Sequence, residues 1–191
     1  MNMLTYSHDA VTADWAVALL DFWFNQVGED GWWRHDPSLD ELCRQRFLSL
    51  WQEKQALPAD AFLGRADDAL AAVLLFDQLP RNMFRHTAQA FATDALARDV
   101  ARSAIAHGYD IQIGGAGRIF FYMPFQHSEA IEDQALSLTL FEGAGDERSL
   151  DFARQHHATI ARFGRFPHRN AALGRTTLAE EAAAAVQGAY W

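Results

Sequence analysis

The sequence has 191 residues, of which 50% are hydrophobic and 13% aromatic, and this composition suits one domain with a sizeable core. Its 25 acidic and 16 basic residues give a formal net charge of −9, which argues against DNA binding that depends on neutralising phosphates. No stretch approaches the roughly 20 apolar residues that cross a bilayer, residues 1–10 lack a secretory signal pattern, and the single cysteine, Cys43, excludes an internal disulfide. We therefore expect a cytoplasmic protein that forms one helical domain over residues 1–191.

Apolar residues at helical spacing, together with capping residues, predict four helices in the first half of the chain. The clearest helix start is Asp36-Pro37. The aspartate can cap a helix, and a proline in the first helical position loses no hydrogen bond, because the N–H there has no partner within the helix. The predicted helices run from Thr12 to the helix-breaking Gly28 and Gly31, from Pro37 to Pro58, from Asp67 to Leu79, and from Thr93 to Gly108.

The second half predicts further helices joined by short turns. Residues 111–113 alternate like a strand but have no partner strand, and residues 114–117 are glycine-rich without the context of a nucleotide-binding loop, so we expect a flexible connection there. The remaining helices are expected from Arg118 to Met123, ending at Pro124, from Ser128, from Ser149 to Gly164, and from the capping box of Thr177 and Glu180. The sequence thus predicts an all-α fold of about seven to nine helices, arranged as stacked antiparallel hairpins without a sheet.

Three segments contain polar residues that helix formation does not explain. They are residues 77–82, 118–129 and 164–170, and in each a proline ends or interrupts a helix close to arginine, histidine or asparagine. Proline fixes the backbone, and side chains beside rigid loop ends are well placed for recognition. Because helix ends gather on one side of a stack of hairpins, we expect the three segments to converge on one pocket.

These segments also carry a resemblance. The pieces Asp77-Gln78-x-Pro-Arg-Asn, Pro-Phe-x-His-Ser-Glu and Gly-Arg-Phe-Pro-His-Arg-Asn, together with Phe91-Ala92-Thr93-Asp94, resemble the bacterial family called domain of unknown function 924. The resemblance extends from Leu20 to Glu181. It departs from the family pattern at residues 114–117, where a proline and a glutamate are expected, and at Leu178, where a proline is usual. It implies a TPR-like helical fold and no particular activity.

The arginines of these segments suggest what the pocket binds. Residues 152–179 contain no carboxylate but five arginines, whereas residues 1–80 are strongly acidic. Arginines beside proline-fixed turns can bind a carboxylate or a phosphate through two parallel hydrogen bonds. The alternative is structural, with these arginines pairing with Asp77, Asp94 and Glu129 to tie loops together. The residues predicted to bind a ligand are Asp77, Arg81, Asn82, Arg165, Arg169 and Asn170.

Proton transfer to or from a bound molecule is assigned to His127, Glu129 and His168, the titratable residues of the second and third segments. A metal is not expected, because acids in a first helical turn are ordinary complements to the helix dipole and no specific ligand spacing is present. No cofactor is expected either. Two functions remain open: a protein that binds, and acts on, a small anionic molecule, and a TPR-like module that grips a peptide or protein partner.

Overall fold

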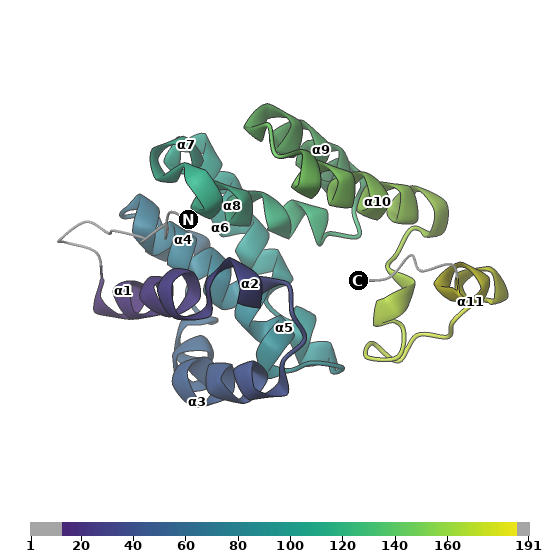
Figure 1. Ribbon diagram of the computed structural model, residues 1–191, viewed down its shortest axis with the longest axis horizontal. Helices are drawn as coiled ribbons and strands as arrows, with labels where there is room; N and C mark the ends of the chain where they lie inside the picture. The colour runs from purple at the N-terminus through teal and green to yellow at the C-terminus, as the bar shows by residue number, and fades with distance from the viewer. Residues whose placement is uncertain (1–12, 187–191) are drawn as a thin grey trace.

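The computed structural model describes residues 13–186 and is 77% helical, with nine helices and no strand in that part of the chain, which confirms the predicted all-α fold (Figure 1). The cap expected at Thr12 lies outside the described residues. Two of the nine helices contain a π-helical segment. The first comprises α1 (Asp14–Leu20), η1 (Asp21–Val27) and α2 (Gly28–Trp32), and the second comprises α4 (Ala66–Val73), η3 (Leu74–Gln78) and α5 (Leu79–Met83).

The remaining helices follow in chain order, with three short 3-10 turns between them. The helices are α3 (Pro37–Lys54), α6 (Asp94–Ala106), α7 (Tyr109–Ile113), α8 (Gly115–Gln126), α9 (Ile131–Ala144), α10 (Glu147–Phe163) and α11 (Ala179–Val186). The turns are η2 (Ala59–Phe62), η4 (Ala88–Phe91) and η5 (Pro167–Arg169). Among residues 13–186 no helix combines the length and the apolar character that crossing a bilayer requires.

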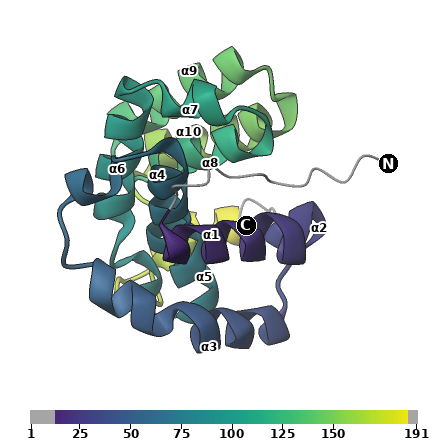
Figure 2. The ribbon, with the colours of Figure 1, turned by 90° about the vertical axis from the view of Figure 1, so that its left-hand side faces the viewer.

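Helix α4 lies at the centre of the molecule. Residues 69–73 of α4 have no exposed surface, and the helix packs against α1, α6, α7 and α8. Helices α3 and α5 pack together on one side, and α9 and α10 lie on the other (Figures 1 and 2). Only two residues join α9 to α10, so these helices form an antiparallel hairpin, and α9 also packs on α8.

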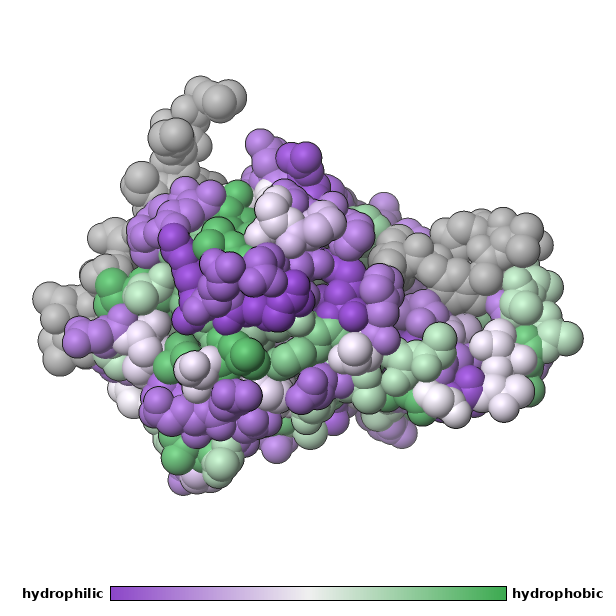
Figure 3. All heavy atoms as spheres, turned by 90° about the horizontal axis from the view of Figure 1, so that it is seen from below, coloured by the Kyte–Doolittle hydropathy of each residue, from purple (hydrophilic) through white to green (hydrophobic). Residues whose placement is uncertain are grey.

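One hydrophobic core connects these layers. It takes side chains from helices between α1 and α10, including Trp23, Phe76, Phe120 and Phe141. Seen from below, the surface is largely hydrophilic with a hydrophobic band across it (Figure 3). Six large hydrophobic side chains are exposed among the described residues, and they are spread along the chain from Trp33 to Leu178.

The glycine-rich connection expected at 114–117 is instead the start of α8, and the strand-like residues 111–113 form the end of α7. Three residues cannot pair as a strand alone, whereas one helical turn satisfies backbone groups locally. Gly117 is required by packing, because a Cβ atom there would meet Ile113 Cγ2 at 2.5 Å and Leu70 Cδ2 at 3.2 Å. The segment is therefore a close contact between helices and not a flexible linker.

Several predicted helix ends shift by a few residues. Pro124 does not end its helix, which continues to Gln126. Helix α10 is capped by Asp146, which accepts a hydrogen bond from the backbone N–H of Ser149, the residue that was expected to be the cap. The cap at Asp36 is confirmed, since its carboxylate accepts from Ser38 N at 2.9 Å.

Candidate functional site

A cavity of about 990 Å³ runs between the α5–η4 region and the helices α8 and α10. One side is closed by His168, Arg169, Ala171 and Ala172, and another is lined by Trp32 at the end of α2 and Trp33 directly after it. Five arginines and four histidines line the cavity, against two acids, Glu29 and Asp146. The basic residues are Arg81, Arg85, His86, Arg118, His127, Arg148, His156, His168 and Arg169.

A buried aspartate–histidine pair lies beside this cavity. Asp77, in the π-helical segment η3, has no exposed surface, and His127, which caps the C-terminal end of α8, is 12% exposed at its side chain. His127 Nδ1 lies 2.8 Å and 3.0 Å from the two carboxylate oxygens of Asp77. An ionised carboxylate only accepts hydrogen bonds, so Nδ1 must donate. The lone pair of the neutral ring is then on Nε2, for which the described residues supply no hydrogen-bond partner.

The ionisation states of this pair follow from its surroundings. Burial lowers the pKa of His127, and nearby Arg81 lowers it further, which outweighs the opposing effect of Asp77. Burial alone would raise the pKa of Asp77, but the charge of Arg81 and the hydrogen bonds from His127 and Gln78 lower it well below its ordinary value. At neutral pH the pair is therefore a carboxylate and a neutral imidazole.

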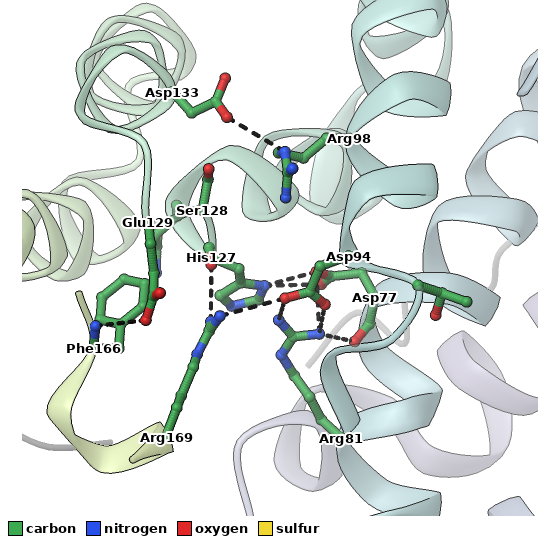
Figure 4. A network of polar contacts seen from close by, with 12 residues as sticks. Asp77, Arg81, Asp94, Arg98, His127, Ser128, Glu129, Asp133, Phe166 and Arg169 are labelled. Atoms are coloured by element: carbon green, nitrogen blue, oxygen red, sulfur yellow. Dashed lines mark hydrogen bonds and ion pairs between the residues drawn. The ribbon is translucent and has the colours of Figure 1, made fainter. Parts of the chain in front are cut away.

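Asp94 connects two arginines next to this pair (Figure 4). Arg81 donates from Nη1 and Nη2 to the two oxygens of Asp94 at 3.0 Å and 3.2 Å, and its Nη1 also lies 3.3 Å from Asp77 Oδ1. Arg169 reaches the same Asp94 from η5 with a longer contact of 3.4 Å. Asp94 thus pairs closely with one arginine and only loosely with the other.

Arg169 is the least satisfied charge in this cluster. Its guanidinium lies between the rings of Phe91 and Phe166, 4.5 Å and 4.6 Å from their centroids, and its Nη2 donates to the carbonyl of His127 at 2.8 Å. The residue is 6% exposed, and its Nε atom has no hydrogen-bond partner. Burial and the neighbouring Arg81 lower the pKa of Arg169 to about 10, so it stays charged at neutral pH.

A proline positions Asp94 against Arg81. Pro80 has no N–H to donate to the carbonyl of Phe76 four residues earlier, and Thr93 Oγ1 donates to that carbonyl instead, at 2.7 Å. Thr93 was expected to cap α6; it does precede the helix, but its hydroxyl makes this contact and no capping hydrogen bond. The contact fixes the start of α6, and with it Asp94, beside the turn of Arg81.

Glu129 and Arg165 belong to a second cluster, which does not line the cavity. Glu129 accepts from Arg175 at 2.8 Å and 3.0 Å and from the backbone N–H of Phe166 at 2.7 Å. Arg165 donates to both oxygens of Glu181 at 2.6 Å and 2.9 Å. This C-terminal cluster ties η5 and α11 to the start of α9.

Asn170 and Asn82 are also held in contacts of this structural kind. Asn170 donates to Glu181 at 3.0 Å, within the C-terminal cluster. Asn82 donates to Asp40 at 3.0 Å, and Arg85 donates to the same carboxylate with two contacts of 2.8 Å. Neither asparagine is among the residues that line the cavity.

The structure therefore brings five predicted site residues to one end of the cavity and leaves four outside its wall. Those at the cavity end are Asp77, Arg81, His127, His168 and Arg169, and those outside are Asn82, Glu129, Arg165 and Asn170. His168 lies exposed on the rim, and its ring is 5.4 Å from that of Phe166. Among residues 13–186, no group of three His, Cys, Asp or Glu side chains is arranged to hold a metal ion.

His156 of α10 lines the cavity but was not among the predicted site residues. It is 7% exposed, and its ring centroid lies 6.3 Å from that of His127. Burial, together with the neighbouring His127, lowers its pKa to about 3. A signal was present, because Ser149, Phe152 and His156 follow helical spacing and share one face of α10 that meets the cavity. Arg118 and Phe91 also line the cavity and were not predicted as site residues.

Comparison with known proteins identifies relatives of the same fold. A model of the family described as bacterial protein of unknown function (DUF924) matches residues 19–188, in agreement with the resemblance seen in the sequence. A solved structure, that of the protein of unknown function ATU0120 from Agrobacterium tumefaciens, is similar with a TM-score of 0.85 and 39% identity, covering 91% of this chain and 97% of that chain. A search of curated proteins gives no match.

Proposed function

The chain belongs to the bacterial family of unknown function DUF924, and we propose that it binds a small anionic organic molecule in the cavity and transfers a proton to or from it through His127. The observation that carries this proposal is the buried Asp77–His127 pair, whose Nε2 has no hydrogen-bond partner among the described residues. Arg169 lies next to this pair, because it donates to the His127 carbonyl, and it contacts Asp94 only at 3.4 Å. Function for this family has to be argued from the site, since a helical fold is shared by many unrelated activities.

The pair supplies the elements of a general base. Nε2 carries the lone pair and can accept a proton, and the imidazolium that forms is stabilised by the carboxylate of Asp77 on its other nitrogen. Glu129, to which the sequence analysis also assigned proton transfer, is bound by Arg175 in the C-terminal cluster, so the proposed proton transfer uses His127 with Asp77.

The arginines supply the binding charge. The two positive charges of Arg81 and Arg169 equal the two negative charges of Asp77 and Asp94, so these four side chains together carry no net charge. An anion that enters beside Arg169 favours the charged form of His127 and raises its pKa. Binding of an anion is therefore expected to be accompanied by uptake of a proton.

This coupling is tested by calorimetric titration of acetate into the protein at pH 7, in two buffers that differ in their ionisation enthalpy. We expect the apparent binding enthalpy to depend on the buffer for the wild type, since a proton is taken up, and to lose that dependence in His127→Gln. His157→Gln, on α10 but outside the cavity wall, is the matched control and should behave as the wild type. Absence of anion binding, or equal proton uptake in His127→Gln, would contradict the proposal.

The alternative of a peptide-binding module finds less support. It predicts an apolar groove, whereas the cavity ends at the charged Arg81–Asp94–Arg169 group, and four of the six large hydrophobic residues exposed among the described ones lie outside its wall. The other two, Trp33 and Ile111, belong to the wall of the cavity itself.

A further inference from the structure

The shape and lining of the cavity say more about the molecule that fits it, an inference that rests on the proposed function. We propose that the ligand is an elongated monocarboxylate whose carboxylate lies at the Arg169 end and whose apolar body extends along α8 towards Trp33. Three features of the cavity support this ligand: its direction, its charge and its change in polarity.

The cavity follows two helices that run in the same direction. Helices α8 and α10 both line it, and they come together at Gln126 and His156, whose side chains approach to 3.5 Å. Helix α9 joins them through short turns at both of its ends, so α8 and α10 are parallel to one another. Cavity residues extend along α8 from Ala116 to His127, eleven positions or about 16 Å at 1.5 Å per residue. The cavity is thus much longer than a small anion.

The charges of the residues at the Arg169 end of the cavity match a ligand with one negative charge. Arg81 and Arg169 balance Asp77 and Asp94, and protonation of His127 adds one positive charge. A monocarboxylate then leaves the site neutral, whereas a phosphate dianion would leave an uncompensated negative charge in a buried place. Arg169 lines the cavity and contacts Asp94 only at 3.4 Å, so a carboxylate at this end would complete the pairing of its charge.

Polarity and exposure change along the cavity. One turn or two from His127, the wall consists of apolar side chains: Met123 and Ile119 of α8, Phe152 of α10 and Phe141 of α9. Towards the start of α8 the apolar residues become exposed, with Trp33 at 44% and Ile111 at 64%. At this end Arg118 already lies 3.8 Å from Asp110, and Glu29 and Asp146 outnumber the remaining Arg148, so no second anionic group is needed. An apolar body lying along this wall would cover exposed hydrophobic surface, and its burial would provide most of the affinity.

The test is calorimetric titration with carboxylates of increasing chain length, acetate, hexanoate and dodecanoate, alongside inorganic phosphate and dodecanol. We expect affinity to rise about fourfold per methylene that enters the cavity, until the cavity is full. Dodecanol, which lacks the carboxylate, should bind much more weakly than dodecanoate. Affinity that is independent of chain length, or phosphate binding as tight as that of dodecanoate, would overturn this inference and leave the proposed anion site standing. Failure of every anion to bind would overturn both.

Paired variants locate the two ends of the ligand. Arg169→Gln should weaken acetate and dodecanoate binding by a similar factor, because both use the carboxylate contact. Ile119→Asn should weaken dodecanoate at least tenfold and leave acetate unchanged, and retained acetate binding shows that the variant is folded. The control is Ile131→Asn, at an exposed position of α9 outside the cavity wall, which should change neither. Equal loss of both ligands in Ile119→Asn would contradict the placement of the apolar body.

Discussion

Two groups of ion pairs, one at the cavity and one at the C-terminus, draw on the same sequence segment and differ in how well their charges are matched. In the C-terminal cluster, Arg165 and Arg175 each make two contacts of 3.0 Å or less with one carboxylate. At the cavity, Arg169 makes a single contact of 3.4 Å with Asp94, a carboxylate that Arg81 also binds. A buried Nε atom without a partner occurs in both clusters, at Arg169 and at Arg175, and does not distinguish them. A bidentate arginine is typical of a structural tie, whereas a buried arginine with one loose carboxylate contact in the wall of a cavity indicates a place for a ligand.

The largest expected effect comes from removing the carboxylate that the two cavity arginines share. Asp94→Asn leaves Arg81 and Arg169 buried side by side with one partner fewer, so the free energy of unfolding should fall by about 3–5 kcal/mol. Chemical denaturation measures this loss. Added acetate should stabilise this variant more than it stabilises the wild type, since the anion replaces the missing charge. A variant as stable as the wild type would show that the two arginines do not depend on Asp94.

The next effect is on the dependence of stability on pH. The pKa of His156 is lowered to about 3 in the folded protein, whereas an unfolded histidine has a pKa near 6.5. Between these values the unfolded chain binds a proton that the folded chain does not, so the free energy of unfolding falls as pH falls through this window. The loss is on the order of 5 kcal/mol over the whole window and about 3 kcal/mol down to pH 4, at a slope of up to about 1.4 kcal/mol per pH unit.

His156→Phe should flatten this part of the stability–pH curve, because the phenyl ring cannot take up the proton. His157→Phe, at the adjacent position of α10, should leave the curve as in the wild type. Denaturant midpoints measured between pH 7 and pH 4 make the comparison. A curve in His156→Phe as steep as that of the wild type would mean that this histidine is not held neutral by its surroundings.

The smallest effect sharpens the contrast between the two arginine environments. Arg169→Met keeps an unbranched side chain between Phe91 and Phe166 and removes an underpaired charge, so stability should stay within about 1 kcal/mol of the wild type. Arg175→Met leaves the half-buried Glu129 without its bidentate partner and should cost about 1–2 kcal/mol. Thermal unfolding in a buffer without small carboxylates measures both. Should Arg169→Met be the more damaging change, Arg169 would be a structural tie and the contrast between the clusters would fail.

Local sequence patterns were sufficient to predict the helices and the general location of the polar residues. Helical spacing, and caps such as Asp36-Pro37, depend on neighbouring residues, so the all-α fold and most helix boundaries could be predicted. Local rules also made errors where packing prevails. Gly117 was assigned to a flexible connection because glycine has no side chain, and that same property allows the start of α8 to approach Leu70 of α4.

Which polar residues share the cavity could not be predicted, because it depends on tertiary packing. Arg165 and Arg169 stand four positions apart beside the same proline and look alike in the sequence, but one meets Glu181 and the other meets Asp94. Glu129 and His127 are separated by one residue. Glu129 is bound by Arg175, whereas His127 pairs with Asp77, 50 positions away. These choices depend on contacts between distant segments. The role of a buried charged side chain depends on which partner packs beside it in the folded protein, and no local sequence pattern specifies that partner.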